Sequence, residues 1–508
     1  MIKNLEPLVK FLRLEKTMIL SQVASRTTAA SPSPRTYSKW SRARGWAGKM
    51  GQKGVFAMCR NFISGSLLFC VFAGMATLSG ASEEIRIYLP TESPLQPLYL
   101  SQLQASGTSF SSQYLQDLEG ILLFDLSHNG STKVTPRLAA KEEVLRQKNR
   151  AQAFQPKIWK EAGIAHVVRG EIEGNLLTIA IFSTATGSLK SFDGIALTGQ
   201  LGKDRRIFHK IADKIHEALF GTPGVASQVI LYSSKATSST KVSEIWMCDC
   251  DGHNARQLTK EATYCVSPVF VSPSPQFASD RFLYVSYKSG QPKIFIASLS
   301  EGVGKRLIDL RGNQLLPAIS KQRDKIAFIC DAGGRTDLFM QQFRPETGDV
   351  GKPVQLFSQP HATQASPTFS PDGSKIAFVS DTGGTPRIYV IPASFNTKRP
   401  TPHLISKKNQ ENSCPSWSPD GKKLAYSAKT KGIRQIWIYD FETGQEWQLT
   451  DGGGNKENPS WAQNSQHLVF NSTDGASSEL YLVNLNQSDV IKISHGPGIK
   501  HYPSWGTR

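Results

Sequence analysis

The chain has 508 residues, of which 39% are hydrophobic and 20% charged, enough to bury the cores of two or three domains. That composition excludes a wholly disordered chain and a membrane protein with many spans. The formal net charge is +18, but residues 1–57 contribute half of it (11 Lys/Arg against 2 Asp/Glu), so the charge does not point to nucleic-acid binding by the folded part.

An apolar run at residues 62–80 contains no charged residue. Ser79 and Ala81 match the small-x-small pattern that signal peptidase cleaves, and a polar stretch begins at Ser82. The pattern predicts a signal peptide over residues 58–81, cut between Ala81 and Ser82. An uncleaved membrane anchor and a lipoprotein signal are the alternatives.

The 57 residues upstream of Met58 are basic, rich in serine and without a periodic pattern. We expect them to be an upstream extension or a mis-assigned start, with translation beginning at Met50 or Met58. An organellar transit peptide has a similar composition and is the rival interpretation.

Residues 82–222 have the mixed periodicity of an α/β domain. Asp204 is expected to cap its last helix and Gly221 to end it. Residues 222–224 then connect to the next domain. The predicted strands are 84–90, 165–173, 175–182 and 191–199, and the predicted helices lie near 156–162 and over 204–221.

A repeat with a proline anchor fills the remainder of the chain. Segments of 15 residues that begin at positions 316, 366, 414 and 458 align without a gap, and an interrupted copy begins at Ser267. The anchoring prolines recur every 44–50 residues, a period typical of β-propeller blades. They are Pro268, Pro317, Pro367, Pro415, Pro459 and Pro503.

Each repeat also contains two alternating apolar runs with a Gly- or Asp-rich turn between them, which predicts a hairpin. The first of six hairpins (229–249) has no proline-anchored strand before it, and the last such strand (502–505) has no hairpin after it. The carboxyl-terminal strand must therefore complete the first blade and close the ring. The sequence predicts an all-β six-bladed propeller over 223–508, with a large β-sandwich as the alternative.

Motifs that would carry chemistry are weak. No G-x-S-x-G nucleophile motif and no phosphate-binding glycine loop occurs. His209 and His216 share the predicted helix but lack a matching carboxylate, and residues 249–252 (Asp-Cys-Asp-Gly) begin like a calcium loop without its later ligands. We therefore expect no catalytic residue, no metal and no cofactor.

Five cysteines follow the predicted signal peptide, an odd and thinly spread set that does not predict a disulfide framework. Pairing of Cys265 with Cys248 or Cys250 stays open. Trp417, Trp461 and Trp505 recur at one position of the repeat and are expected in the core.

Several motifs together resemble the TolB family, periplasmic components of the Tol–Pal system of Gram-negative envelopes. They are the EIRIYLP start (84–90), the GTPGVASQVILYSS junction (221–234), the SPTFSPDGSKIAFVS repeat (366–380) and the terminal YPSW (502–505). The resemblance covers residues 82–508. It implies a non-enzymatic, monomeric periplasmic adaptor that links a TolA-like inner-membrane protein to a Pal-like lipoprotein and supports envelope integrity and constriction of the outer membrane in cell division, without nucleic acid.

The resemblance also implies two binding segments. A TolA-like partner is expected on the amino-terminal segment of the mature chain, which matches Glu84, Ile85, Arg86, Ile87 and Tyr88. Pal is expected on the loops that lead into the proline-anchored strands, which carry Tyr264, Asn313, Gln314, His361, Gln364, Asn412, Lys456, Asn458 and His501. The resemblance further suggests that occupancy of the propeller alters the amino-terminal segment.

The chain departs from the family in its upstream 57 residues and in a longer loop at 271–281, which is expected to alter the mouth where Pal would dock. Two other function classes also fit a propeller. One is a propeller hydrolase or lyase. The other is a module that binds a sugar, another small ligand or a different envelope protein. The aromatic residues Tyr264 and Tyr502 near the mouth would suit such binding.

Overall fold

The computed structural model describes residues 85–87, 94–146, 153–273, 280–344, 351–396, 400–487 and 489–507. The expected signal peptide, the upstream extension, the cleavage pair Ala81 and Ser82, and Glu84 and Tyr88 lie outside these residues. No helix within the described part of the chain combines the length and the apolar character that a bilayer crossing requires.

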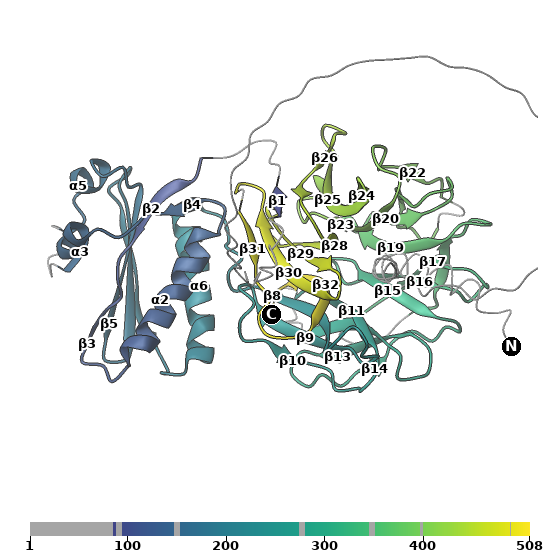
Figure 1. Ribbon diagram of the computed structural model, residues 1–508, viewed down its shortest axis with the longest axis horizontal. Helices are drawn as coiled ribbons and strands as arrows, with labels where there is room; N and C mark the ends of the chain where they lie inside the picture. Colours follow the sequence, from purple (N-terminus) through teal and green to yellow (C-terminus); the bar gives the residue numbers. More distant parts are fainter. Residues whose placement is uncertain are drawn as a thin grey trace, which may run out of the picture. The chain divides into compact units, whose positions relative to one another are not determined.

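The amino-terminal region is an α/β fold built on one sheet in the order β4-β2-β5-β6-β7, with β3 paired to β5 (Figure 1). Strand β2 runs parallel to β4 and β5, whereas β5, β6 and β7 form an antiparallel meander. The strands are β2 (Gln96–Leu100), β3 (Gln104–Ser106), β4 (Thr132–Val134), β5 (His166–Glu173), β6 (Leu176–Ser183) and β7 (Leu189–Ala196), and the helices are α2 (Ser112–Ser127), α3 (Ala139–Arg146), α5 (Pro156–Lys160) and α6 (Leu201–Phe220).

Both faces of this sheet are buried. Successive residues of a strand point to opposite faces, so each strand contributes to two cores. Leu98 and Leu100 of β2 pack in one core with residues of α2 and α6. Tyr99 between them packs in a second core with Leu145 of α3 and Trp159 of α5. Apolar residues on both faces of one strand therefore fix a three-layer arrangement.

The predicted strands 165–173, 175–182 and 191–199 and both predicted helices are confirmed, with shifts of a few residues. The expected cap of α6 is wrong. The helix begins earlier, after Gln200, which gives no side-chain cap. Asp204 lies within the first turn, where its carboxylate accepts hydrogen bonds from Thr198 and, at 2.6 Å, from the Tyr114 hydroxyl.

Six sheets of four antiparallel strands form the propeller, as predicted (Figure 1). The first three blades are β8 (Val229–Lys235), β9 (Glu244–Asp249) and β10 (Arg256–Gln257) with β32; β11 (Cys265–Phe270), β12 (Arg281–Ser286), β13 (Lys293–Ser298) and β14 (Lys305–Arg306); and β15 (Gln314–Ile319), β16 (Lys325–Cys330), β17 (Asp337–Gln342) and β18 (Val354–Phe357). The next three are β19 (Gln364–Phe369), β20 (Lys375–Ser380), β21 (Arg387–Pro392) and β22 (His403–Leu404); β23 (Asn412–Trp417), β24 (Lys423–Thr430), β25 (Ile433–Asp440) and β26 (Glu446–Gln448); and β28 (Asn455–Trp461), β29 (His467–Asp474), β30 (Ser477–Asn484) and β31 (Val490–Lys492).

The carboxyl-terminal strand closes the ring. Strand β32 (Ile499–Gly506) pairs antiparallel with β8 and supplies the inner strand of the first blade. This pairing confirms the closure expected from the sequence. That expectation rested on a last proline-anchored strand with no hairpin after it.

Candidate functional site

Each inner strand of the propeller carries the same backbone irregularity. The residue before each anchoring proline has a positive φ, a region that residues other than glycine rarely adopt. The pairing register with the second strand shifts at the same point, as in a β-bulge. The residues are Ser267 (51°), Leu316 (49°), Ser366 (45°), Cys414 (50°), Asn458 (53°) and Tyr502 (53°).

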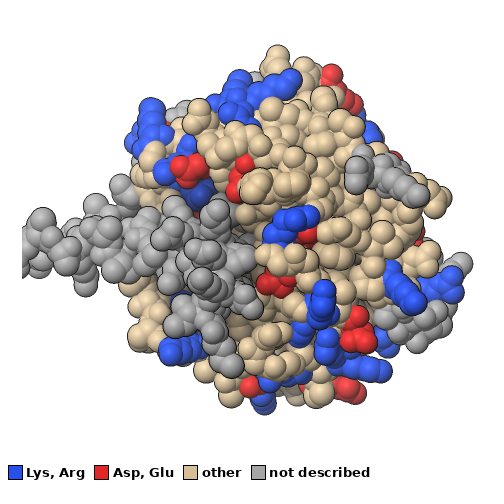
Figure 2. Space-filling view, turned by 90° about the vertical axis from the view of Figure 1, so that its right-hand side faces the viewer, with Lys and Arg blue, Asp and Glu red and all other residues tan. Residues whose placement is uncertain are grey.

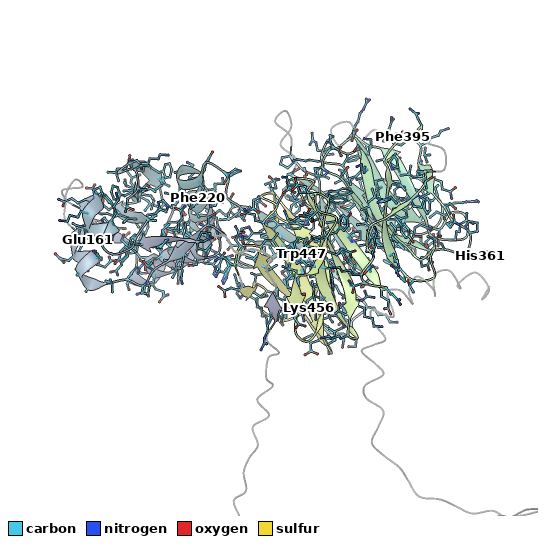
Figure 3. The ribbon with its side chains drawn as sticks, turned by 90° about the horizontal axis from the view of Figure 1, so that it is seen from above. Glu161, Phe220, His361, Phe395, Trp447 and Lys456 are labelled. Carbon is cyan, nitrogen blue, oxygen red and sulfur yellow. The ribbon has the colours of Figure 1, made fainter. Side chains whose placement is uncertain are left out.

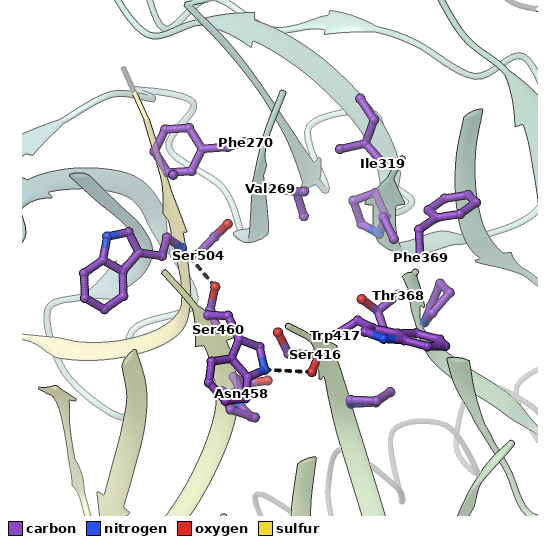
Figure 4. Close-up of a pocket in the computed structure, with 18 of the residues that line it drawn as sticks. Val269, Phe270, Ile319, Thr368, Phe369, Ser416, Trp417, Asn458, Ser460 and Ser504 are labelled. Carbon is purple, nitrogen blue, oxygen red and sulfur yellow. Dashed lines mark hydrogen bonds between the residues drawn. The ribbon is translucent and has the colours of Figure 1, made fainter. Parts of the chain in front are cut away.

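These six residues line the central cavity of the propeller, which has a volume of about 380 Å³ (Figure 4). Hydrogen bonds join neighbouring inner strands around its wall. The Trp461 indole donates to the Ser416 carbonyl at 3.0 Å, and the Trp505 amide donates to the Ser460 hydroxyl at 3.0 Å. The repeated bulge thus presents one side chain per blade to a common channel.

The expected Pal-binding residues do not form one set. Gln314, Gln364, Asn412 and Lys456 occupy the same position, three residues before the proline, and all four are fully buried. The side chains of Gln314, Asn412 and Lys456 bond to the loops that lead into the inner strands, whereas the buried Gln364 amide has no hydrogen-bond partner among the described residues. The Gln314 amide, for example, donates to the carbonyl oxygen of Leu310 at 2.8 Å. The three bonded side chains therefore fix the shape of their loops.

Lys456 is the strongest of these anchors, since its amine donates to the carbonyl oxygens of Gly452 (2.8 Å), Gly453 and Gly454 (3.1 Å). Lys500 occupies the equivalent position in β32, is 2% exposed, and donates in the same way to Gly496 and Gly498. Lys500 is not among the residues predicted from the sequence, although its spacing from Pro503 matches that of Lys456 from Pro459.

The other expected Pal contacts are more accessible. His361 is exposed, with Figure 3 showing it at the outer edge of the propeller, and Tyr264, Asn313, Asn458 and His501 are partly exposed. We define the mouth as the end of the channel formed by the loops before β11, β15, β19, β23, β28 and β32. Asn458 is the expected contact that also lines the cavity.

The histidine at the mouth carries a shifted pKa. Burial lowers the pKa of His501 to about 4, because the charged imidazolium loses hydration. His501 is therefore neutral at pH 7 and is suited to hydrogen bonding rather than to ion pairing.

The amino-terminal segment forms a short strand, β1 (Arg86–Ile87), on the propeller and not on the α/β sheet. Arg86 pairs antiparallel with Asp451, and Ile87 pairs with Thr450, both of β27 (Thr450–Asp451). Strand β27 is followed directly by the glycine loop that Lys456 holds. Thus the expected TolA segment pairs with the strand that leads directly into one loop of the mouth.

Two further expectations concern side chains. All five cysteines in the described residues are free, which leaves no disulfide among Cys248, Cys250 and Cys265. Trp461 and Trp505 are buried, whereas Trp417 is partly exposed and stacks on Phe441 with ring centroids 4.7 Å apart.

Figure 2 shows Lys and Arg interspersed with Asp and Glu on one face of the molecule, with large uncharged areas between them.

The chain is similar to several known proteins. Residues 216–508 match the family model described as the TolB beta propeller domain. A protein of Protochlamydia amoebophila (strain UWE25), named Protein TolB homolog, is 49% identical over 411 residues, or 79% of this chain and 88% of that protein. A protein of the same name from Chlamydia felis (strain Fe/C-56) is 36% identical over 394 residues, or 77% and 85% of the two chains. The crystal structure of TolB from Acinetobacter baumannii shares the fold with a TM-score of 0.66 at 20% identity and covers 84% of this chain and all of its own.

Proposed function

The chain belongs to the TolB family, and on that premise we propose that it is a non-enzymatic periplasmic adaptor, monomeric on its own, between a TolA-like inner-membrane protein and a Pal-like outer-membrane lipoprotein. The observation that carries the proposal is the pairing of β1 with β27. This pairing supports the proposal because it connects the segment expected to bind one partner with a loop expected to bind the other.

The mouth is the proposed Pal site. Its loops are held by buried side chains such as Lys456 and Gln314, so the surface is preformed, as in most tight protein complexes. Exposed or partly exposed His361, Asn313 and Tyr264 supply the contacts at the rim. The longer segment 271–281 connects the carboxyl end of β11 to β12, whereas the mouth lies at the amino ends of the inner strands, so we propose that this segment leaves the docking surface unchanged.

The amino-terminal segment is the proposed TolA site. Its strand is two residues long, and its partner β27 is equally short, so little pairing energy holds it. Arg86 is exposed. An extended segment of this kind can leave β27 and add to the edge of a partner's sheet, a common mode of peptide recognition.

A pull-down from envelope extract tests the Pal site, with the chain from Ser82 onward as bait and mass spectrometry as the readout. We expect recovery of a Pal-like lipoprotein. The triple variant Tyr264→Ala, Asn313→Ala, His361→Ala should lose it. The control is Lys422→Ala, because Lys422 is exposed on a turn at the other end of the inner strands. Equal recovery with the triple variant and the control would contradict docking at the mouth.

Coupling between the two sites needs a separate measurement. We propose that a lipoprotein bound at the mouth shifts the glycine loop before β28 and so changes the pairing of β1 with β27. The affinity for the TolA-like protein, measured by calorimetry with and without the lipoprotein, should then differ. Equal affinities would contradict the coupling and leave both docking sites standing.

One observation favours a second function, the binding of a small ligand in the channel. The cavity of about 380 Å³ is lined by Trp417 and Tyr502 together with several hydroxyl groups, a mixture typical of ligand pockets. A screen of sugars and small envelope metabolites should reveal a saturable rise in melting temperature if the channel has such a ligand. An adaptor with no ligand shows none.

A further inference from the structure

Four buried polar side chains meet at the point where α6 approaches the end of β9. They are Asp125 of α2, His209 of α6, Asp249 at the end of β9 and Asp251 in the turn that follows, and each is 5% exposed or less. The sequence expectation treated His209 and the Asp-Cys-Asp turn separately, as an ordinary helix residue and a plain turn. The fold brings them together.

The imidazole of His209 has one satisfied nitrogen and one unsatisfied nitrogen. Nδ1 lies 2.7 Å from Oδ2 of Asp125, so the ring donates its N–H there. Nε2 has no hydrogen-bond partner and lies 3.9 Å from Oδ2 of Asp249 and 3.8 Å from Oδ2 of Asp251. Nε2 thus faces two carboxylate oxygens in a buried space, an arrangement that needs a positive charge at this point, either the proton of an imidazolium or a bound metal ion.

The charges of the cluster do not balance. Within the described residues, one arginine or lysine forms an ion pair with these three carboxylates. It is Arg205, which contacts Asp251. Asp249 accepts a neutral hydrogen bond from Asn254 at 2.7 Å. With a neutral His209 imidazole, three buried carboxylates against one guanidinium leave an excess of two negative charges, the amount that one divalent cation neutralises.

We propose that His209 Nε2, Asp249 and Asp251 bind one divalent transition-metal ion of the zinc class. The nitrogen ligand favours such an ion over calcium or magnesium, which prefer oxygen ligands alone. Metal bonds of about 2.1 Å set tetrahedral ligand atoms about 3.4 Å apart, so small side-chain rotations bring the three atoms into range. Asp125 is the positioning residue, since a carboxylate on the far nitrogen commonly orients a metal-binding histidine.

The bound ion would tie His209 of helix α6 to Asp249 at the end of β9, about 40 residues further along the chain. Its role is structural, and it stands apart from the mouth and from β1. The inference therefore does not depend on the proposed adaptor function.

The test uses the full protein, freed of metal by chelation and dialysis, and titrated with Zn²⁺ by calorimetry and with Co²⁺ by visible absorption. We expect one ion per chain, d–d bands typical of a site with four or five ligands, and a higher melting temperature with Zn²⁺. His209→Gln and Asp249→Asn should each weaken binding at least about tenfold.

The control is His495→Gln. The His495 ring stacks on His253 near the same turn, with centroids 4.1 Å apart, and this pair could hold a metal adventitiously. Binding should be unchanged in this variant. Two variants at different ligands keep the test decisive if one of them fails to fold. The proposal is overturned if the folded protein binds no Zn²⁺, if binding survives in every folded ligand variant, or if it is lost in His495→Gln.

Discussion

The α/β region and the propeller differ in how their structure is encoded. In the propeller blades, every strand except β32 pairs with its neighbours in sequence, and the same pattern recurs six times. In the α/β region, β2 pairs in parallel with β4 and β5, so its partners lie tens of residues away. Local, repeated pairing can be predicted from the sequence. Closure of the ring depends on the single long-range pair between β32 and β8.

Replacing residues 500–508 by a flexible linker of equal length should have the largest effect on this comparison. The first blade then loses its inner strand and exposes the edge of β8. We expect the propeller to lose its cooperative melting transition, while the α/β region stays resistant in limited proteolysis because it shares no strand with β32. An unchanged melting temperature would refute closure by the last strand.

Lys456→Met tests whether the buried amine holds the mouth. The substitution keeps the chain length and leaves the carbonyl groups of the glycine loop without this donor. A loss of about 2–4 kcal/mol in the free energy of unfolding is expected, since each unsatisfied buried group costs about 1–3 kcal/mol. Lys429→Met is the control, because the Lys429 ion pair with Glu411 is exposed and should cost under about 1 kcal/mol. Equal losses in chemical denaturation would contradict the anchoring role.

The next prediction concerns pH and a contact between the two regions. His467 of β29 donates from Nε2 to the carbonyl oxygen of His128 at 2.7 Å, and burial lowers its pKa to about 4. The unfolded chain, with a pKa near 6.5, binds a proton in the window between these values that the folded chain does not. Stability should therefore fall as pH drops from about 6.5 to 4, by about 1.4 kcal/mol per unit for this residue.

His467→Gln removes that proton and should flatten the acid slope by the same amount. Denaturant midpoints at a series of pH values measure it. The Lys429→Met variant keeps the histidine and should retain the wild-type slope. A slope that is unchanged in His467→Gln would assign the acid sensitivity to other groups.

The smallest effect is expected within the α/β region. Asp204→Asn weakens the hydrogen bonds that the carboxylate accepts from Thr198 and Tyr114. We expect a loss of about 1–2 kcal/mol, because hydrogen bonds to a charged group are worth more than neutral ones. Thermal melts that follow α6 report it, and the neighbouring exposed Lys203→Gln should have no effect.

The sequence predicted the propeller fully because proline spacing, hairpins and the orphan last strand all agree. It missed helices α2 and α3, because the continuous apolar run 121–124 of α2 hides its helical spacing and α3 has only eight residues, and the burial of both helices depends on distant strands. It placed the cap of α6 at Asp204, because a capping residue and a buried acceptor look alike until the partner at Tyr114 is known.

The candidate site was predicted only in outline. The repeat located the loops of the mouth, but it could not separate buried anchors such as Gln314 from accessible residues such as His361, since both are polar residues at or just before the start of an inner strand. The pairing of β1 with β27 and the cluster around His209 were invisible, because each joins segments that are remote in the chain.

The most direct test of the adaptor account is the envelope pull-down with the chain from Ser82 onward, compared with the variant of the three mouth residues. The account predicts that a peptidoglycan-associated lipoprotein is recovered with the unaltered bait and lost with the variant. A folded bait that recovers no envelope partner would contradict it and would favour a ligand-binding channel instead.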